Sequence, residues 1–265
     1  MAMTDAPVPV RSPLPQSLAG RTAVILGGSS GIGLAAGELL ASAGARIVLA
    51  GRDKERLDAA VARVTAAGTG AEVSGTAADV ADESALEEVF ERAGTVDHVL
   101  VTAGRPAGMG PVAGLTRDTV GTTVEAPAWA ALTAARAAVP RMPPGGSITL
   151  TSGILVARPR PGMSAPLAAV GAVEALTRAL AVELAPSRLR VNAIRFGAFD
   201  TPLLRGLYGA AAGAEGDAAM AEAGGDMPLG RFGTAEEAAS AALFLMANAY
   251  MSGEILTIDG GQSLA

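Results

Sequence analysis

Short apolar runs alternate with helical patterns along most of the chain. Seven short runs are predicted to be strands, most of them nearly continuously apolar, and they cover residues 22–26, 46–50, 71–77, 98–101, 147–151, 190–194 and 255–258. Between them, apolar residues recur at helical spacing, which predicts helices at 32–43, around 57–64, around 86–90, and at 122–139, 167–185 and 235–247. Pro127 is expected to disturb the start of the helix at 122–139, because proline lacks an amide hydrogen.

This alternation predicts the fold class. Strands that alternate with helices of this length form parallel βαβ units, and nearly continuous apolar strands belong to a sheet with both faces covered. The chain contains no solenoid-type repeat and no convincing domain boundary. We therefore expect one α/β domain over residues 18–265, built on a doubly wound parallel sheet of about seven strands with helices on both faces.

Two segments depart from this pattern. Residues 1–17 are rich in proline and lack periodicity, so we expect a flexible or surface-draped arm. Residues 202–227 contain repeated glycines between the sixth predicted strand and the next helix. A long, glycine-punctuated segment at this place is typical of a mobile lid over a binding site.

Composition excludes several classes of function. Half of the 265 residues are apolar, yet no run approaches the roughly 18 residues that span a membrane. The net charge is −6 without a basic cluster, which disfavours nucleic acid and anionic membranes as partners. There is no cysteine, so disulfides, thiolate catalysis and cysteine-type zinc sites are excluded, and we expect no metal. The N-terminus lacks a secretory pattern, so a cytoplasmic protein is expected.

A glycine-rich turn joins the first predicted strand to the first predicted helix. It reads Leu26-Gly-Gly-Ser-Ser-Gly-Ile-Gly33, with glycines at 27, 31 and 33. Such glycines permit a tight turn and the close approach of backbone to a pyrophosphate, which meets the free amides at the helix start. The alternative is a turn that is glycine-rich without a ligand. The strand before it and the helix after it favour a nucleotide site in a Rossmann-type fold.

Further motifs stand at the ends of other predicted strands. Asp79-Val80 follows the third strand, and Val101-Thr-Ala-Gly104 follows the fourth. Residues 190–202 read Arg-Val-Asn-Ala-Ile-Arg-Phe-Gly-Ala-Phe-Asp-Thr-Pro, and residues 258–261 read Ile-Asp-Gly-Gly. Together with the glycine turn, these motifs resemble the short-chain dehydrogenase/reductase family over about residues 19–261, with phenylalanine at 196 where the family usually has proline.

The resemblance implies an oxidoreductase that binds a nicotinamide cofactor. In such a site Asp79 and Val80 would hold the adenine. Ala103 and Gly104 would pass beside the ribose, and Thr201 would meet the nicotinamide amide. The resemblance also implies a homodimer or homotetramer built on the long central helices. The expected cofactor contacts are Gly27, Ser29, Ser30, Gly31, Ile32, Gly33, Arg52, Asp79, Val80, Ala103, Gly104, Gly197 and Thr201.

The end of the second strand favours NADP(H) over NAD(H). An acidic residue there binds the ribose 2′-hydroxyl and repels a 2′-phosphate, but this chain reads Leu-Ala-Gly-Arg at 49–52. Arg52 can contact a phosphate through two N–H groups, and Ser29 or Ser30 can donate a further hydrogen bond. The alternative is that Arg52 is a solvated residue paired with Asp53 at the helix start.

The resemblance also implies a catalytic set that this chain lacks. The family pairs a tyrosine with a lysine four residues later and adds a serine and an asparagine. These positions fall on Pro166, Val170, Gly153 and near Pro127. The only tyrosines, at 208 and 250, are followed four residues later by alanine and glutamate, so no Tyr-x-x-x-Lys exists anywhere. A positioned acid contributes about 10²–10⁴ in rate, so ordinary carbonyl chemistry is in doubt.

Three residues are weak candidates for a substitute. Ser152, beside the serine position, can orient a substrate or merely satisfy a backbone group. Arg158, in the loop after the fifth strand, can bind an anionic substrate or lie in solvent. Tyr208 lies in the predicted lid and can donate a proton on closure. His98 is expected to be structural, and Trp129 is expected to be a packing or interface aromatic.

Three interpretations therefore stay open. The chain is an atypical NADP(H)-dependent oxidoreductase whose substrate needs little proton assistance, for example an iminium-like acceptor. Alternatively, it is a non-catalytic NADP(H)-binding protein, or a non-redox enzyme such as an isomerase or lyase on the same scaffold. An intact apolar pocket favours the first and third interpretations, and a collapsed pocket at Pro166 and Val170 favours the second.

Overall fold

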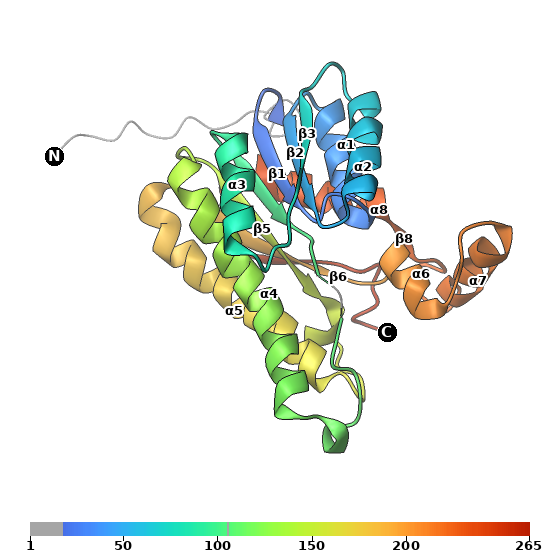
Figure 1. Ribbon diagram of the computed structural model, residues 1–265. Helices are drawn as coiled ribbons and strands as arrows, with labels where there is room; N and C mark the ends of the chain where they lie inside the picture. Colours follow the sequence, from blue (N-terminus) through green and yellow to red (C-terminus); the bar gives the residue numbers. More distant parts are fainter. Residues whose placement is uncertain (1–17, 105) are drawn as a thin grey trace.

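Seven parallel strands form one sheet in the computed structural model, which describes residues 18–104 and 106–265 (Figure 1). The strand order is β3-β2-β1-β4-β5-β6-β9. The order reverses between β1 and β4, and in a doubly wound sheet the ligand crevice lies at the carboxyl ends of the strands at this reversal. The predicted fold class is confirmed. The proposed arm at 1–17 lies outside the described residues.

The strands and helices follow one another in regular alternation. Their bounds are β1 Thr22–Leu26, α1 Gly31–Ser42, β2 Arg46–Gly51, α2 Lys54–Ala67, β3 Val73–Ala77, α3 Glu83–Ala93, β4 His98–Val101, η2 Val112–Gly114, α4 Arg117–Ala138, η3 Val139–Arg141, β5 Ser147–Gly153, η4 Ile154–Val156, α5 Ser164–Leu184, η5 Ala185–Ser187, β6 Arg190–Phe196, β7 Phe199–Asp200, α6 Pro202–Tyr208, α7 Ala214–Gly224, β8 Gly233–Thr234, α8 Ala235–Ala247 and β9 Ile255–Ile258.

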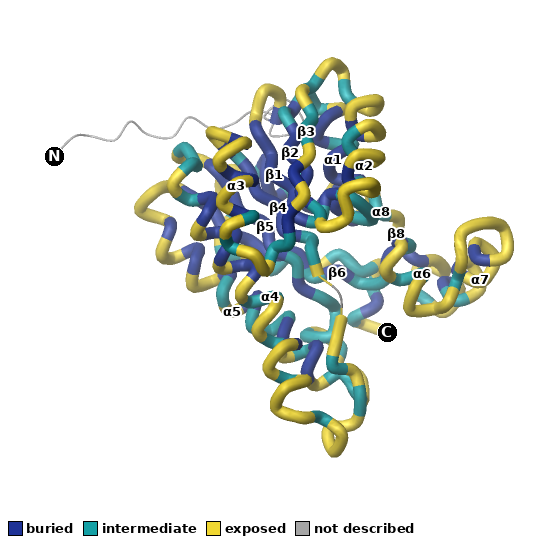
Figure 2. Tube along the Cα trace, viewed as in Figure 1, coloured by how far each residue is buried: buried dark blue, intermediate teal, exposed yellow. Residues whose placement is uncertain are grey.

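Two helical layers cover the sheet, and each encloses its own core. Helices α3, α4 and α5 lie on one face, and α1, α2 and α8 lie on the other (Figure 1). All five residues of β1 are buried, and buried chain follows the central strands in Figure 2. Because burial of a large apolar side chain stabilises by roughly 1.5–3 kcal/mol, these two cores fix the sheet that positions the site.

Helix α4 begins earlier than its apolar pattern predicted. It starts at Arg117, where the hydroxyl of the N-cap residue Thr116 accepts a hydrogen bond from the amide of Thr119 at 3.1 Å. Pro127 therefore lies in the middle of the helix, and the expectation that it would disturb the helix start was wrong. A proline inside a helix leaves the carbonyl four residues earlier without its amide partner.

The segment at 202–227 contains two helices, α6 and α7, which the sequence pattern did not predict. The Arg205 guanidinium joins them, because its Nε donates to Asp200 Oδ1 at 2.6 Å and its Nη1 donates to Asp217 Oδ1 at 2.8 Å. Both helices project from the side of the sheet and are mostly exposed (Figures 1 and 2). One arginine therefore ties the two helices to β7 at their base.

His98 is buried at the start of β4, as a structural residue would be. Its Nδ1 lies 2.9 Å from the hydroxyl of Ser147 on the neighbouring strand β5. Burial lowers the pKa of His98 from its ordinary value of 6.5 to about 4, and the charges of Arg190 and Arg21 add to this effect while Asp97 opposes it. The imidazole is therefore neutral in the folded protein at neutral pH.

Acidification is expected to destabilise the protein through His98. Between pH 6.5 and about 4 the unfolded chain takes up a proton at this residue and the folded chain does not, so stability falls as the pH falls. Urea unfolding at about pH 7.5 and about pH 4.5 should show that the natural protein loses about 2 kcal/mol more than the His98→Gln variant. Equal losses in the two proteins would contradict a buried neutral histidine.

Candidate functional site

The turn after β1 lies against the chain that leaves β4. The carbonyl of Leu26 accepts hydrogen bonds from the amides of Thr102 at 2.8 Å and Ala103 at 3.0 Å. A Cβ atom at Gly27 would come within 2.6 Å of the Ala103 nitrogen, and one at Gly33 would come within 2.6 Å of Thr102 Oγ1. Gly27 also has a φ of +94°. Only glycine fits at these two positions.

The first turn of α1 presents a row of free backbone amides. Ser30 is the N-cap residue, but its side chain makes no capping hydrogen bond, whereas side chains cap α2, α3, α4, α6 and α8. Within the described ranges, the amides of residues 29–33 have no hydrogen-bond acceptor. Free amides at a helix N-terminus attract an anion. The pyrophosphate of a dinucleotide fits this cradle.

The expected determinants of the adenosine half lie together at the end of β2. A Cβ atom at Gly51 would come within 2.9 Å of the Ser29 hydroxyl, so Ser29 lies where a carboxylate at 51 would stand. Arg52 follows directly, and its Nη1 lies 3.8 Å from Asp79 Oδ2. Both side chains of this ion pair are substantially exposed, so the pair contributes little stability and Arg52 can exchange its partner for a phosphate.

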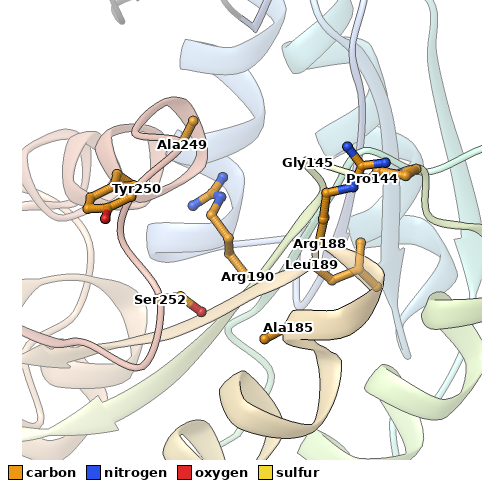
Figure 3. Close-up of a pocket in the computed structure, with 9 residues that line it drawn as sticks. All are labelled: Pro144, Gly145, Ala185, Arg188, Leu189, Arg190, Ala249, Tyr250 and Ser252. Carbon is orange, nitrogen blue, oxygen red and sulfur yellow. The ribbon is translucent and has the colours of Figure 1, made fainter. Parts of the chain in front are cut away.

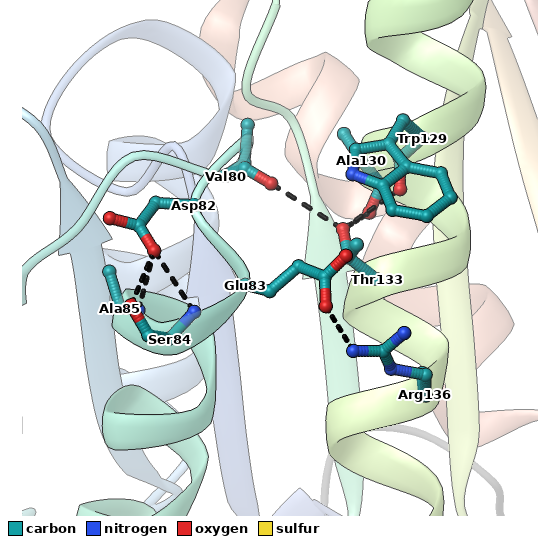
Figure 4. A network of polar contacts seen from close by, with 9 residues as sticks. All are labelled: Val80, Asp82, Glu83, Ser84, Ala85, Trp129, Ala130, Thr133 and Arg136. Carbon is teal, nitrogen blue, oxygen red and sulfur yellow. Dashed lines mark hydrogen bonds and ion pairs between the residues drawn. The ribbon is translucent and has the colours of Figure 1, made fainter.

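Contacts from α4 hold the loop that carries Val80. The hydroxyl of Thr133 lies 3.4 Å from the carbonyl oxygen of Val80 and 2.8 Å from that of Trp129 (Figure 4). An ion pair between Arg136 and Glu83 joins α4 to the start of α3 in the same view. These contacts join the loop after β3 to α4, and the ion pair with Arg52 places Asp79 beside the end of β2.

The chain after β6 carries Thr201, the residue that the resemblance assigns to the nicotinamide. A Cβ atom at Gly31 would come within 3.6 Å of the Thr201 side chain, so Thr201 lies beside the glycine turn. Thr201 is buried and is the N-cap residue of α6. At Gly197, a Cβ atom would come within 2.7 Å of Asp259 Cα, which keeps this segment against the turn after β9. The expected contacts Gly31, Gly197 and Thr201 thus lie at the carboxyl edge of the sheet, where a doubly wound fold has its ligand crevice.

The positions of the family's catalytic set carry no acid or base. Pro166 is buried, Val170 is half-buried, and a Cβ atom at Gly153 would lie 4.0 Å from Val170 Cγ1. The Gly110 amide donates to the Gly162 carbonyl at 2.8 Å, which closes the loops beside the first turn of α5. At the positions that the resemblance assigns to a tyrosine, a lysine and a serine, this chain therefore carries no acidic or basic side chain.

The three weak catalytic candidates are engaged elsewhere in this conformation. The Ser152 hydroxyl donates to Glu174 Oε1 at 2.7 Å, and both residues are buried. Arg158 Nη1 donates to the carbonyl of Gln262 at 2.8 Å. The half-exposed ring of Tyr208 lies against Phe232 with a centroid distance of 5.7 Å. The structure does not bring these three candidates together.

Sequence reasoning missed Gln262, a buried residue that joins three loops of the site. Its carbonyl accepts from Arg158 in the loop after β5, and its side-chain oxygen accepts from the amide of Ala198 after β6 at 3.0 Å. Its backbone amide donates to the backbone carbonyl of Asp259 after β9. Its position one residue after the Asp-Gly-Gly motif was the only signal for it in the sequence.

A separate hollow lies away from this crevice. It has a volume of about 500 Å³ and is lined in part by Arg188, Arg190 and the almost fully exposed Tyr250 (Figure 3). Arg190 begins β6, so the hollow is at the amino ends of the strands, opposite the glycine turn. The described residues contain no group of histidine, aspartate and glutamate side chains that could hold a metal ion. No described helix is long and apolar enough to cross a membrane.

The fold and the crevice define a Rossmann-type nucleotide-binding protein, and comparison with known proteins gives the family. Residues 27–263 match the family described as enoyl-(acyl carrier protein) reductase. The chain is 34% identical over 263 residues to the short-chain dehydrogenase/reductase ATR9 of Stachybotrys chlorohalonatus, with 94% of this chain and 99% of that protein covered. The chain belongs to the short-chain dehydrogenase/reductase family of oxidoreductases, which bind a nicotinamide cofactor. The resemblance seen in its motifs is confirmed.

Two solved structures are similar over nearly the whole chain. One is the MalC reductase/Diels-Alderase of Malbranchea aurantiaca, with a TM-score of 0.84, 29% identity and coverage of 94% of this chain and 99% of that one. The other is an NADPH-bound short-chain oxidoreductase from Pseudomonas aeruginosa PAO1, described as containing an atypical catalytic centre. Its TM-score is 0.84 and its identity is 31%, with 93% of this chain and 98% of that one covered.

Replacement of Gly33 by alanine is expected to abolish nucleotide binding. The added methyl group would overlap the Gly27 carbonyl oxygen and Thr102, and overpacking of this kind costs about 1–3 kcal/mol of unfolding free energy. Calorimetric titration with NADPH and thermal unfolding would measure both effects. Gly121→Ala is the matched control, because a Cβ atom there meets nothing within 4 Å. If the Gly33→Ala variant still binds NADPH, the glycine turn is not part of the nucleotide site.

Proposed function

We propose that this chain is an NADP(H)-dependent reductase that transfers hydride without the family's tyrosine and lysine. The observation that carries the proposal is the combination of an intact cradle and a catalytic set replaced by Pro166, Val170, Gly153 and, nearby, Pro127. When bound, the cofactor supplies the hydride. This chain's own residues supply the binding site and its orientation.

The preference for NADP(H) rests on charge at the end of β2. Ser29 and Arg52 offer donors to a 2′-phosphate, and Gly51 offers no carboxylate to a 2′-hydroxyl. Asp79 lies 3.8 Å from Arg52 and partly offsets its charge. The similarity to an NADPH-bound relative supports the same choice.

The preference is expected to depend on Arg52. The Arg52→Ala variant should bind NADPH about tenfold more weakly and NADH unchanged, because a hydrogen bond to a charged group contributes about 1.5–3 kcal/mol. Calorimetric titration of both cofactors checks this. Arg56→Ala is the control, since Arg56 lies on the same exposed stretch but pairs with Asp53 at 3.6 Å. Equal affinities for NADPH and NADH in the natural protein would contradict the proposal.

The acceptor is the second part of the proposal. A neutral ketone that gains a hydride becomes an alkoxide, and none of the side chains at the four aligned positions can protonate it. An acceptor with a cationic carbon–nitrogen double bond becomes a neutral amine and needs no acid at that step. The carbon atoms of Val170 and Pro166 also remove the lysine charge that would repel a cation. We therefore propose an iminium-like, largely apolar acceptor.

Helices α6 and α7 are proposed to be the lid of this site. Helix α6 follows Thr201 directly, and its Leu203 and Leu207, one helical turn apart, expose apolar surface. Such a surface can cover an apolar substrate when the helices move toward the crevice. A homodimer or homotetramer built on α4 and α5 is proposed from the family, and Trp129 on α4 is partly exposed, as an interface residue would be.

One comparison favours a second candidate function. The relative from Malbranchea aurantiaca is described as both a reductase and a Diels-Alderase. A non-redox reaction on the same scaffold would need a shaped apolar site and no proton donor. That requirement agrees with glycine, proline and valine at 153, 166 and 170.

Imines and ketones of matched shape should separate these functions. We expect NADPH oxidation with cyclic iminium substrates at a rate at least about 100-fold above that with the ketones, because only the ketones need the missing acid. Gly31→Val serves as the control without cofactor binding, since its side chain would point at Thr201 from a backbone with φ +53°. Ketone turnover that survives Ser152→Ala and Tyr208→Phe would refute the charge argument. Absence of turnover on both panels would favour a binding protein.

A further inference from the structure

A largely buried ion pair lies one helical turn beyond the positions that the resemblance assigns to the family's tyrosine and lysine. Glu174 is on α5, and it follows Pro166 and Val170 at intervals of four residues, which places all three on one face of the helix. Its carboxylate accepts Arg195 Nε at 2.9 Å and Arg195 Nη2 at 2.8 Å, in a bidentate arrangement. The Ser152 hydroxyl donates to the same carboxylate at 2.7 Å.

The three residues, here called the α5 anchor, join three elements. Ser152 is on β5, Glu174 on α5 and Arg195 on β6, and Arg195 Nη1 also lies 3.2 Å from Thr257 Oγ1 on β9. Burial alone would raise the pKa of Glu174, but the hydrogen bonds from Arg195 and Ser152 outweigh it and lower the pKa. The carboxylate therefore stays ionised, and both of its oxygen atoms are occupied.

The α5 anchor lies at the point along α5 where the helix begins to bury large apolar side chains. From Val173 onward the helix buries large side chains such as Leu180 and Leu184. Before that point it buries only Ala165, Pro166 and Ala169, which contribute little apolar area. The first two turns of α5, which form the wall of the crevice, therefore depend on other contacts for their position.

We propose that the α5 anchor positions the wall of the cofactor crevice. Ser152 precedes Gly153 at the end of β5, so one carboxylate holds both the strand end and the helix that face the nicotinamide side. Pro166 and Val170 have no side-chain groups that could form polar contacts with a cofactor. The α5 anchor, one turn further along the same helix face, therefore holds this part of α5 before cofactor arrives.

This inference rests on the nucleotide site proposed above, but not on the acceptor. It assigns Ser152 a positioning role in place of a catalytic one. It also explains why a glutamate occupies a helix face that is otherwise apolar, because a buried carboxylate requires charged and hydrogen-bonding partners.

Hydrogen exchange and cofactor titration on matched variants test the proposal. Glu174→Gln should accelerate exchange of the amides at 167–172 in the nucleotide-free protein by about tenfold, and should raise the Kd for NADPH by about as much, the size typical of coupling between neighbouring groups. The control is Glu38→Gln, which breaks the pair between Glu38 and Arg63 on α1 and α2. The control should change neither quantity.

A double variant separates positioning from stability. Glu174→Met combined with Arg195→Met replaces a buried pair by apolar side chains, which commonly preserves stability, so thermal unfolding should return toward that of the natural protein. Exchange at 167–172 and the Kd for NADPH should remain altered. If thermal stability, exchange and the Kd all return to the values of the natural protein, the α5 anchor contributes only to packing and the proposal is overturned. Unchanged exchange in Glu174→Gln would overturn it as well. If the natural protein binds no NADPH, the proposed function fails, and the exchange measurement still decides the anchor.

Discussion

The contact between the turn after β1 and the end of β4 is the constraint on which the rest of the site depends. The two backbones approach so closely that neither Gly27 nor Gly33 can carry a side chain. This approach directs the chain into α1 with its first amides unpaired. Other residues of the proposed nucleotide site lie around that turn, with Ser29 beside Gly51 on one side and Thr201 beside Gly31 on the other. A backbone arrangement, rather than any charged side chain, therefore defines the proposed anion site.

The cradle was predictable from sequence because its chemistry lies in consecutive residues. Glycines at 27, 31 and 33 between a buried strand and a helix specify a local backbone shape. The strands at 22–26 and 98–101 were predictable to the residue, since every residue in them is buried. The start of α4 was not predictable, because its first turn is exposed and polar and only Thr116 marks it.

Contacts between distant residues account for what the sequence pattern did not predict. Helices α6 and α7 are short, and α7 is rich in glycine and alanine. Arg205 of α6 holds them in place through Asp217 of α7 and Asp200 of β7. Glu174 follows Ser152 by 22 residues, and Gln262 follows Arg158 by 104. No periodicity connects such pairs, because the fold alone brings them within hydrogen-bond distance.

The position of Gln262 has a consequence for how the chain can diverge. Three loops around the crevice form hydrogen bonds with this one buried residue. An insertion or deletion in any of them would therefore displace Gln262 and break its hydrogen bonds to the other two loops. The lengths of the three loops are therefore coupled, so that evolution or engineering must change them together. The turn between α6 and α7, at residues 209–213, has no such link among the described contacts. Changes in substrate range are thus most easily accommodated at that turn of the proposed lid, away from the three loops that Gln262 joins.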